Sequence, residues 1–275
     1  MVPTATGMGT MAGPGKLIIH AGFHKTGTTS VQMALHGNRE ALADHVDILL
    51  RDDILPLTQA ARHFSKRRTP ESLAEVARQA DACFAAIAGG TRPVVIATED
   101  LSGMMPGRAG LDSYSAAPIL MQTLERAALA RLGAATPMVF YFSTRAADPW
   151  VESLWWQHLR STRIETDLDD YRREAQAAAD LDAIIAAVRG ALGHASVVSH
   201  ALEDIRQAPE GPVSVLYDLL DLPQALRGPA PKPANTRPPC GLEPIFLALN
   251  RSGLPDDCVS DTKRRLLRAA RRNAD

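Results

Sequence analysis

The sequence predicts an α/β domain of P-loop type, with a doubly wound parallel sheet flanked by helices and a helical, proline-rich C-terminal extension. Short apolar runs alternate with helical patterns over residues 16–206, and a glycine-containing turn separates the first run from the first helix. The 275 residues, 45% of them hydrophobic, are enough to bury a large core. We therefore expect a ligand site beyond the carboxyl ends of the parallel strands.

Five apolar runs are expected to form the strands, at residues 16–22, 45–50, 92–100, 136–145 and 194–201. Helices are expected at residues 27–37, 69–90, 119–133 and 168–192, and from Asp148 and Pro149 onward. The run TPMVFYFSTR (136–145) is the strongest strand signal because it is rich in β-branched and aromatic residues. Thr69 and Pro70 suit the N-cap and first position of a helix, as do Asp148 and Pro149.

Composition divides the chain into three segments. Residues 1–15 are expected to be a disordered leader, residues 16–206 the core, and residues 207–275 an extension packed on the same domain. The extension has proline-rich connections around the short helical pattern VSVLYDLLDL. Its tail, DTKRRLLRAARR, predicts a basic helix, with a solvated face as the favoured interpretation and polyanion binding as the alternative.

Charge and cysteine content exclude several classes of protein. A net charge of -1 gives no overall field that would attract nucleic acid or an anionic membrane. Cys83, Cys240 and Cys258 are too few and too scattered for a disulfide framework or a metal cluster. No apolar stretch reaches the length of a membrane span. We expect a cytoplasmic protein with no bound metal, no nucleic-acid partner and no membrane span.

The stretch HAGFHKTGTTSVQ (20–32) predicts an anion site. Gly22 and Gly27 keep the glycine spacing of a P-loop, but Thr28 stands where the P-loop lysine would be, and the lysine lies inside the loop as Lys25. Backbone N–H groups converge where such a loop enters a helix, and the helix dipole favours negative charge there. The alternative is a tight turn that happens to contain two glycines.

This stretch resembles the sulfotransferases that use 3′-phosphoadenosine 5′-phosphosulfate (PAPS), whose bacterial branch often reads H-x-G-x-x-K-T-G-T-T-x-x-Q. The matching residues are His20, Gly22, Lys25, Thr26, Gly27, Thr28, Thr29 and Gln32. The family's second signature is an arginine that ends a later strand with a serine eight residues on, matched by Arg145 and Ser153. The resemblance covers roughly residues 15–160.

The resemblance implies a role for each matching residue. Lys25 would contact the oxygen that bridges phosphorus and sulfur, and Arg145 and Ser153 would bind the 3′-phosphate of PAPS. The loop from Lys25 to Ser30 would hold the 5′-phosphate, through Lys25, Thr26, Gly27, Thr28, Thr29 and Ser30. A transferring sulfuryl group carries less negative charge than a phosphoryl group, so no metal is expected.

A base for the acceptor is expected where the third strand ends. Glu99 and Asp100 stand there, and the family uses either a glutamate or a histidine as base. Glu99 is the better candidate, and His24, beside the loop, is the next because it can reach the site; His63 is a further candidate. The alternatives are that Glu99 pairs with a loop arginine and that Asp100 caps the next turn. His20 alternates with the strand and is expected in the core.

Four further segments have weaker signals. The basic run RHFSKRR (62–68) is expected as a loop, either solvated or in contact with donor phosphates or an acidic acceptor. The tryptophans at 150, 155 and 156 are expected to pack in the core. Residues 100–117 are the expected lid, and residues 234–239 lie where sulfotransferases often close the 3′-phosphate site, although the R-K-G triplet is missing.

Three functions fit these patterns. The first is a PAPS-dependent sulfotransferase acting on a hydroxyl or amine of a small-molecule or carbohydrate acceptor. The second is a divergent P-loop kinase that uses a nucleoside triphosphate and magnesium, with VVIATED as its acidic strand. The third is a non-catalytic nucleotide-binding relative. Magnesium dependence separates the first two, and any turnover excludes the third.

Overall fold

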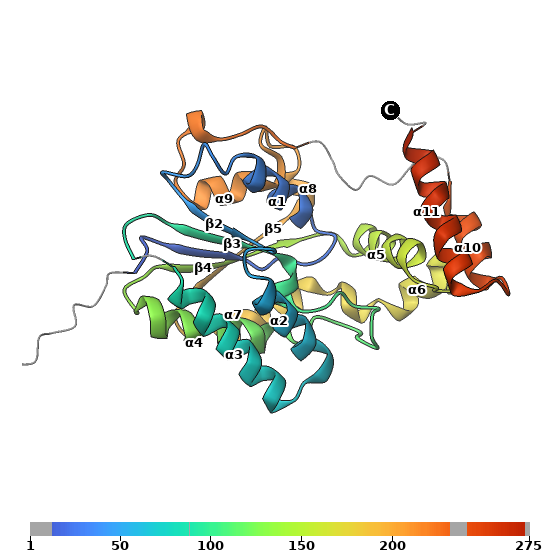
Figure 1. Cartoon of the computed structure of the whole chain (residues 1–275), viewed down its shortest axis with the longest axis horizontal. Helices are drawn as coiled ribbons and strands as arrows, with labels where there is room; N and C mark the ends of the chain where they lie inside the picture. Colours follow the sequence, from blue (N-terminus) through green and yellow to red (C-terminus); the bar gives the residue numbers. More distant parts are fainter. Residues whose placement is uncertain (1–12, 88, 232–240, 273–275) are drawn as a thin grey trace, which may run out of the picture.

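The structure is a computed structural model that describes residues 13–87, 89–231 and 241–272. It is an α/β fold around one five-stranded sheet in which every pairing is parallel, as the alternating pattern predicts (Figure 1). The strand order is β2-β3-β1-β4-β5. The strands are β1 (Leu17–His20), β2 (Asp47–Leu50), β3 (Val94–Ala97), β4 (Met138–Thr144) and β5 (Ser196–Ala201). The predictions for the leader up to residue 12 and for residues 234–239 lie outside the described residues.

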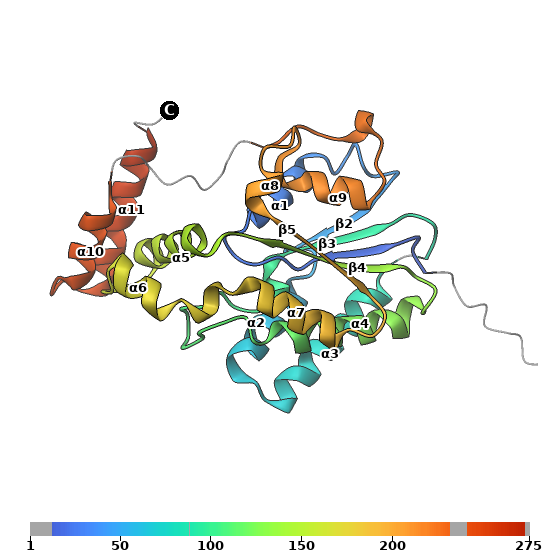
Figure 2. The ribbon, with the colours of Figure 1, turned by 180° about the vertical axis from the view of Figure 1, so that it is seen from behind.

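Helices cover both faces of the sheet (Figures 1 and 2). One face carries α1 (Thr28–Gly37), α8 (Leu202–Ile205) and α9 (Ser214–Leu219). The other carries α2 (Leu55–Arg67), α3 (Pro70–Ala85), α4 (Ala117–Leu132) and α7 (Leu181–Ala191). Leu17 and Ile19 pack into the core on the α4 side, and Ile18 packs into the core on the α1 side. This double coverage explains why the first three residues of β1, Leu17 to Ile19, are all apolar.

A third group of helices lies beyond the carboxyl ends of the strands (Figures 1 and 2). It comprises α5 (Ala147–Ser161), α6 (Leu168–Glu174), α10 (Glu243–Arg251) and α11 (Asp256–Arg272). Phe246 of α10 stacks on Trp156 of α5 with ring centroids 5.5 Å apart, and Lys263 of α11 donates to the carbonyl oxygens of Leu159 and Thr162. Helices α10 and α11 are therefore attached to α5 by these contacts.

The loop after β1 lies at the switch point of the sheet, where the strands that follow in the chain are added first on one side of β1 and then on the other. β1 pairs with β3 on one side and with β4 on the other, and His20, Ala97 and Tyr141 lie level across these three strands. The loops that follow β1, β3 and β4 therefore start side by side at one edge. Ligands bind at this switch point in open parallel sheets.

The predicted basic loop at 62–68 is wrong, because residues 62–67 form the second half of α2. Apolar residues recur along this helix at Leu57, Ala61 and Phe64, and all three are buried. The cluster of charges hid this periodicity. The helix ends at Arg68, which adopts a left-handed conformation with φ 56°.

The helices differ from the prediction in several places. The segment 168–192 is broken into α6, a short 3-10 turn and α7, because Asp167 and Asp180 each cap a new helix through their side chains. Asp148 is not an N-cap, since α5 begins at Ala147 with Ala146 as its N-cap. The helix from Pro70 ends at Ala85, before the two glycines, and α10 was not predicted. Thr69 does cap α3, and Pro70 is its first residue.

Among the described residues, none of the helices combines the length and apolar character that a bilayer crossing requires.

Candidate functional site

A cleft of about 420 Å³ opens at the carboxyl edge of the sheet. It is lined by the loop after β1, the residues that follow β3 and β4, and one face of α5. Nine of the residues singled out from the sequence line it together: His24, Lys25, Gly27, Thr28, Thr29, Ser30, Glu99, Arg145 and Ser153. Tertiary structure thus brings together residues that lie 120 positions apart in the chain.

The β1–α1 loop (residues 21–27) has a strained backbone that only certain residues allow. Lys25 and Gly27 both adopt positive φ angles, 70° and 95°. The positive φ favours glycine at position 27, and a β-carbon there would also displace the end of the Leu202 side chain, whose Cδ1 would lie 2.8 Å away. No side chain among the described residues caps the N-terminus of α1. The N–H groups of its first turn, at Thr28 and Thr29, are suited to an anion.

Thr26 is buried beneath the loop, whereas Lys25 and Gly27 on either side of it line the cleft. Its side chain is fully buried, and its hydroxyl donates to the carbonyl oxygen of Phe23 and contacts the Ser143 hydroxyl at 2.8 Å. The side chain therefore ties the loop to β4 and does not line the cleft.

Lys25 is the cation at the centre of the cleft. Its Nζ donates to Oε1 of Gln157 on α5, at 3.2 Å. Burial and the nearby guanidinium groups of Arg160 and Arg145 lower the pKa of Lys25 to about 8. An ammonium group in this setting gains stability from any anion that enters.

Arg145 follows β4 directly and reaches back across the sheet edge. Its guanidinium donates to the carbonyl oxygen of Lys25 at 3.3 Å and lies 4.0 Å from Oε1 of Glu203. Burial lowers the pKa of Arg145 from its usual value. Ser153 lines the same cleft from the second turn of α5. The loop, Arg145 and Ser153 therefore form one surface.

Glu99 and Asp100 are neighbours with different partners. Glu99 accepts a hydrogen bond of 2.5 Å at Oε2 from the Gln32 side chain, and none of the ion pairs between described residues includes it. Asp100 is buried and lies 2.8 Å from Arg51 and 3.6 Å from Arg62. Burial alone would raise the pKa of Asp100, but hydrogen bonds with His24 and Arg51 hold it below its ordinary value.

Both alternative roles that the sequence left open for this pair are wrong. Glu99 bonds to an amide rather than to a loop arginine. The side chain that caps the turn from Glu99 to Ser102 belongs to Thr98, which accepts from the backbone N–H of Asp100. Asp100 instead joins β3 to α2 through Arg62.

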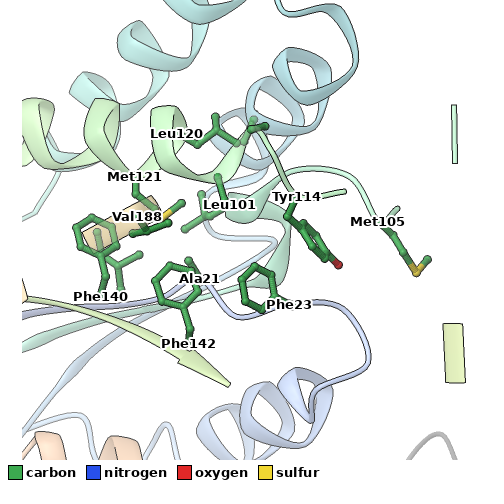
Figure 3. Packing of buried hydrophobic residues seen from close by; sticks show 14 of the residues in the cluster. Ala21, Phe23, Leu101, Met105, Tyr114, Leu120, Met121, Phe140, Phe142 and Val188 are labelled. Atoms are coloured by element: carbon green, nitrogen blue, oxygen red, sulfur yellow. The ribbon is translucent and has the colours of Figure 1, made fainter. Parts of the chain in front are cut away.

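His24 is held at both ring nitrogens. Its Nδ1 lies 2.9 Å from the hydroxyl of Tyr114, and its Nε2 lies 3.6 Å from Oδ1 of Asp100. Tyr114 is almost completely buried and packs on Phe23 at the edge of the core (Figure 3). These contacts hold the His24 ring between Tyr114 and Asp100, whereas the Glu99 carboxylate accepts from the Gln32 amide.

The other two histidines from the sequence analysis lie elsewhere. His20 is buried in the core, where it stacks on Tyr141 at 4.5 Å, and burial lowers its pKa to about 4. His63 is exposed on α2 and does not line the cleft.

The structure adds residues to the site that the sequence analysis missed. Gln157 and Arg160 line the cleft from the same face of α5 as Ser153. Helical spacing is the signal that finds them, since residues at i, i+4 and i+7 share one face. Met105 and Arg108 line the cleft from the expected lid at 100–117, which Tyr114 fastens to the loop through His24.

The cleft is strongly basic although the whole chain is nearly neutral. Its lining includes five basic side chains, Lys25, Arg62, Arg108, Arg145 and Arg160, against the two carboxylates of Glu99 and Asp100. Such an excess of positive charge at one edge of a sheet suits a ligand with several anionic groups.

Comparison with protein-family models and with curated protein sequences gives no match for this chain.

Proposed function

We propose that this protein is a sulfotransferase that moves the sulfuryl group of PAPS to a hydroxyl or amine of a small-molecule or carbohydrate acceptor. The observation that carries the proposal is the meeting of Lys25, Arg145 and Ser153 in one cleft. PAPS has anionic groups at two separate positions, the 5′-phosphosulfate and the 3′-phosphate. The β1–α1 loop suits the first, and the pair of Arg145 and Ser153 suits the second.

In the proposed reaction the acceptor oxygen forms a bond to sulfur while the bond between sulfur and the bridging oxygen breaks. The electron pair of that bond leaves with 3′-phosphoadenosine 5′-phosphate (PAP), and Lys25 stabilises the charge that develops on its oxygen. The acceptor's proton passes to Glu99. Gln32 fixes one oxygen of that carboxylate, which keeps the base oriented toward the acceptor.

The same cleft is less well suited to a magnesium-dependent kinase than to a sulfotransferase. Asp100 stands where the acidic strand of a kinase would hold magnesium, but its carboxylate is already shared among Arg51, Arg62 and His24. Thr28 occupies the position of the P-loop lysine, and a hydroxyl cannot neutralise a triphosphate. Both features favour a sulfuryl donor.

The assignment of the 3′-phosphate is tested by calorimetric titration of PAP and AMP into wild type and Arg145→Ala. Charge-assisted hydrogen bonds contribute about 1.5–3 kcal/mol each, so losing the guanidinium should weaken PAP binding roughly ten- to a hundredfold. AMP, which has no 3′-phosphate, should bind both proteins alike. Arg126→Ala is the matched control, because Arg126 is exposed on α4 and does not line the cleft.

Two results would contradict the proposal. Wild type that binds PAP no better than AMP has no 3′-phosphate site. An Arg145→Ala variant that keeps the full preference for PAP would mean that Arg145 serves only its contact with Glu203.

A further inference from the structure

The residues that line the cleft from α5 and from the chain just before it are spread along the helix rather than gathered at one point. Arg145 lies two residues before the helix, Ser153 lies in its middle, and Arg160 lies in its last turn. With a rise of 1.5 Å per residue, α5 separates its two ends by about 20 Å. Lys25 bonds to Gln157, between Ser153 and Arg160. If the donor lies between Arg145 and Lys25, then Arg160 lies on the acceptor's side of the reacting centre.

A second arginine meets Arg160 at that end of the cleft. Arg108, from the loop after β3, donates to the hydroxyl of Ser161, and its Nε is buried without a hydrogen-bond partner among the described residues. Arg160 donates to the neutral amide oxygen of Gln157 at 3.2 Å. None of the ion pairs between described residues includes Arg108 or Arg160. Two half-buried cations are thus brought together with no anion from the part of the chain that the structure describes, which is unfavourable unless a ligand supplies one.

Most basic residues near Arg108 and Arg160 do have a partner. A second cavity of about 450 Å³, between α5 and α11, is also lined by Arg160. Its other basic residues have partners: Arg163 pairs with Asp256, Arg264 pairs with Asp261, and Lys263 donates to two carbonyl oxygens. Arg62, in the first cleft, is 3.6 Å from Asp100. Arg271 of α11 also acts electrostatically on Arg160, but it lines neither cavity. Lys25 has no ion pair among the described residues either, but it faces the proposed donor. The cleft cations that remain without an anion are therefore Arg108 and Arg160.

We propose that the acceptor carries an anionic group, a sulfate, phosphate or carboxylate, and that Arg108 and Arg160 bind it. This inference rests on the proposed function and narrows it, since it restricts the acceptor to compounds that carry an anionic group besides the hydroxyl or amine. The anionic group would anchor the acceptor at the far end of α5 and leave its hydroxyl between Lys25 and Glu99. A neutral acceptor would leave both arginines without a counterion.

The experiment uses wild type saturated with PAP, titrated with glucose 6-sulfate, inorganic sulfate and glucose at constant ionic strength, with binding followed by NMR. We expect both sulfates to bind and glucose not to bind. Arg108→Gln and Arg160→Gln should each weaken sulfate binding about tenfold or more, because each removes a charge-assisted contact. Arg108→Lys and Arg160→Lys should keep most of the affinity, and the PAP affinity of all four variants should change less than about threefold.

Each contrary result overturns the inference. Failure of both sulfates to bind PAP-saturated wild type, or equal binding by the glutamine variants, shows that no such anion site exists. If Lys25→Ala alone abolishes sulfate binding, the ion occupies the position of the reacting sulfuryl group. If the glutamine variants lose PAP as strongly as Arg145→Ala does, both arginines belong to the donor site. The proposed function fails by a separate measurement, the preference of wild type for PAP over AMP.

Discussion

Lys25 combines a left-handed backbone with a partly buried ammonium group, and both depend on what surrounds it. We expect the Lys25→Ala variant to lose most of the wild-type kcat while its affinity for PAP stays nearly unchanged. The physical reason is that, in the proposed reaction, the lysine acts on charge that develops at the bridging oxygen only as the sulfuryl group leaves. Steady-state kinetics and calorimetry on the same preparation measure the two quantities. A variant with wild-type kcat removes Lys25 from the reaction.

The pH dependence provides an independent test of the same residue. The pKa of Lys25 is lowered to about 8, chiefly by burial and by Arg160 and Arg145, so the free protein loses this positive charge as the pH rises through 8. We expect kcat/KM to fall above that pH, since this ratio reports groups of the free enzyme. In Lys25→Arg any residual activity should persist to higher pH. An unchanged alkaline profile in that variant would assign the fall to another group.

Glu99 and Asp100 are adjacent in the chain, but their contacts predict different effects of substitution: a loss of turnover at Glu99 and a loss of stability at Asp100. Glu99→Gln should lower kcat about 10²- to 10⁴-fold, the range for a lost general base, with PAP affinity and thermal stability retained. Asp100→Asn should lower the free energy of unfolding by about 1–3 kcal/mol, because Arg51 and Arg62 lose the carboxylate that joins them. Kinetics and thermal unfolding of both variants distinguish the roles. If Glu99→Gln unfolds early or turns over normally, Glu99 is structural.

At the scale of elements, α5 is the part on which the site depends most. Trp150, Trp155 and Trp156 are buried and pack into the core, as the sequence analysis expects. Ser153, Gln157 and Arg160 line the cleft from the same helix. The last turn of the helix is held by Lys263 of α11, whose Nζ donates to the carbonyl oxygens of Leu159 and Thr162. A cation at a helix C-terminus also interacts favourably with the helix dipole.

Lys263→Met keeps most of the side-chain volume and removes the donors. We expect it to lower the free energy of unfolding by about 1–3 kcal/mol, because the Leu159 carbonyl loses its donor in a buried site and the Thr162 carbonyl keeps only a long contact with Asn250. Lys66→Met is the matched control, since Lys66 is exposed on α2. Denaturant unfolding of the three proteins measures the difference. Equal stability of the two variants would show that α11 does not hold α5.

The burial of Lys263 also predicts how this difference changes with pH. Burial, with a smaller effect of Arg163, lowers the pKa of Lys263 from 10.5 to about 8 in the folded protein. The folded state therefore binds fewer protons at this site between pH 8 and 10.5, and stability from this group is lost as the pH falls through 8. The gap in stability between wild type and Lys263→Met should be larger at pH 9.5 than at pH 7.

At the scale of the whole molecule, the strand order creates one strongly basic region on a chain whose net charge is -1. We expect PAP at a hundred times its Kd to stabilise the protein by about 2.7 kcal/mol, measured by thermal unfolding. AMP, ATP and GTP at equal concentrations should stabilise it less, and EDTA should not reduce turnover. A larger shift with ATP and magnesium than with PAP would favour the kinase reading.

Sequence by itself determined the order and type of the main elements, because helix and strand periodicities and caps such as Thr69 are local properties. It also determined which loop could bind an anion, since the glycines, hydroxyls and lysine of residues 22–30 are contiguous. Local patterns failed where charge hid an apolar repeat, as in α2, and where aspartate caps divided a long helical pattern, as at Asp180.

Only the tertiary structure decided which residues share the cleft. The sheet order brings the loops after β1, β3 and β4 to one edge, and α5 then adds Gln157 and Arg160. The partners that separate Glu99 from Asp100 come from distant helices and are absent from any local pattern. The unmatched charge of Arg108 and Arg160 has the same origin, because a counterion is a property of packing and depends on which side chains meet in space.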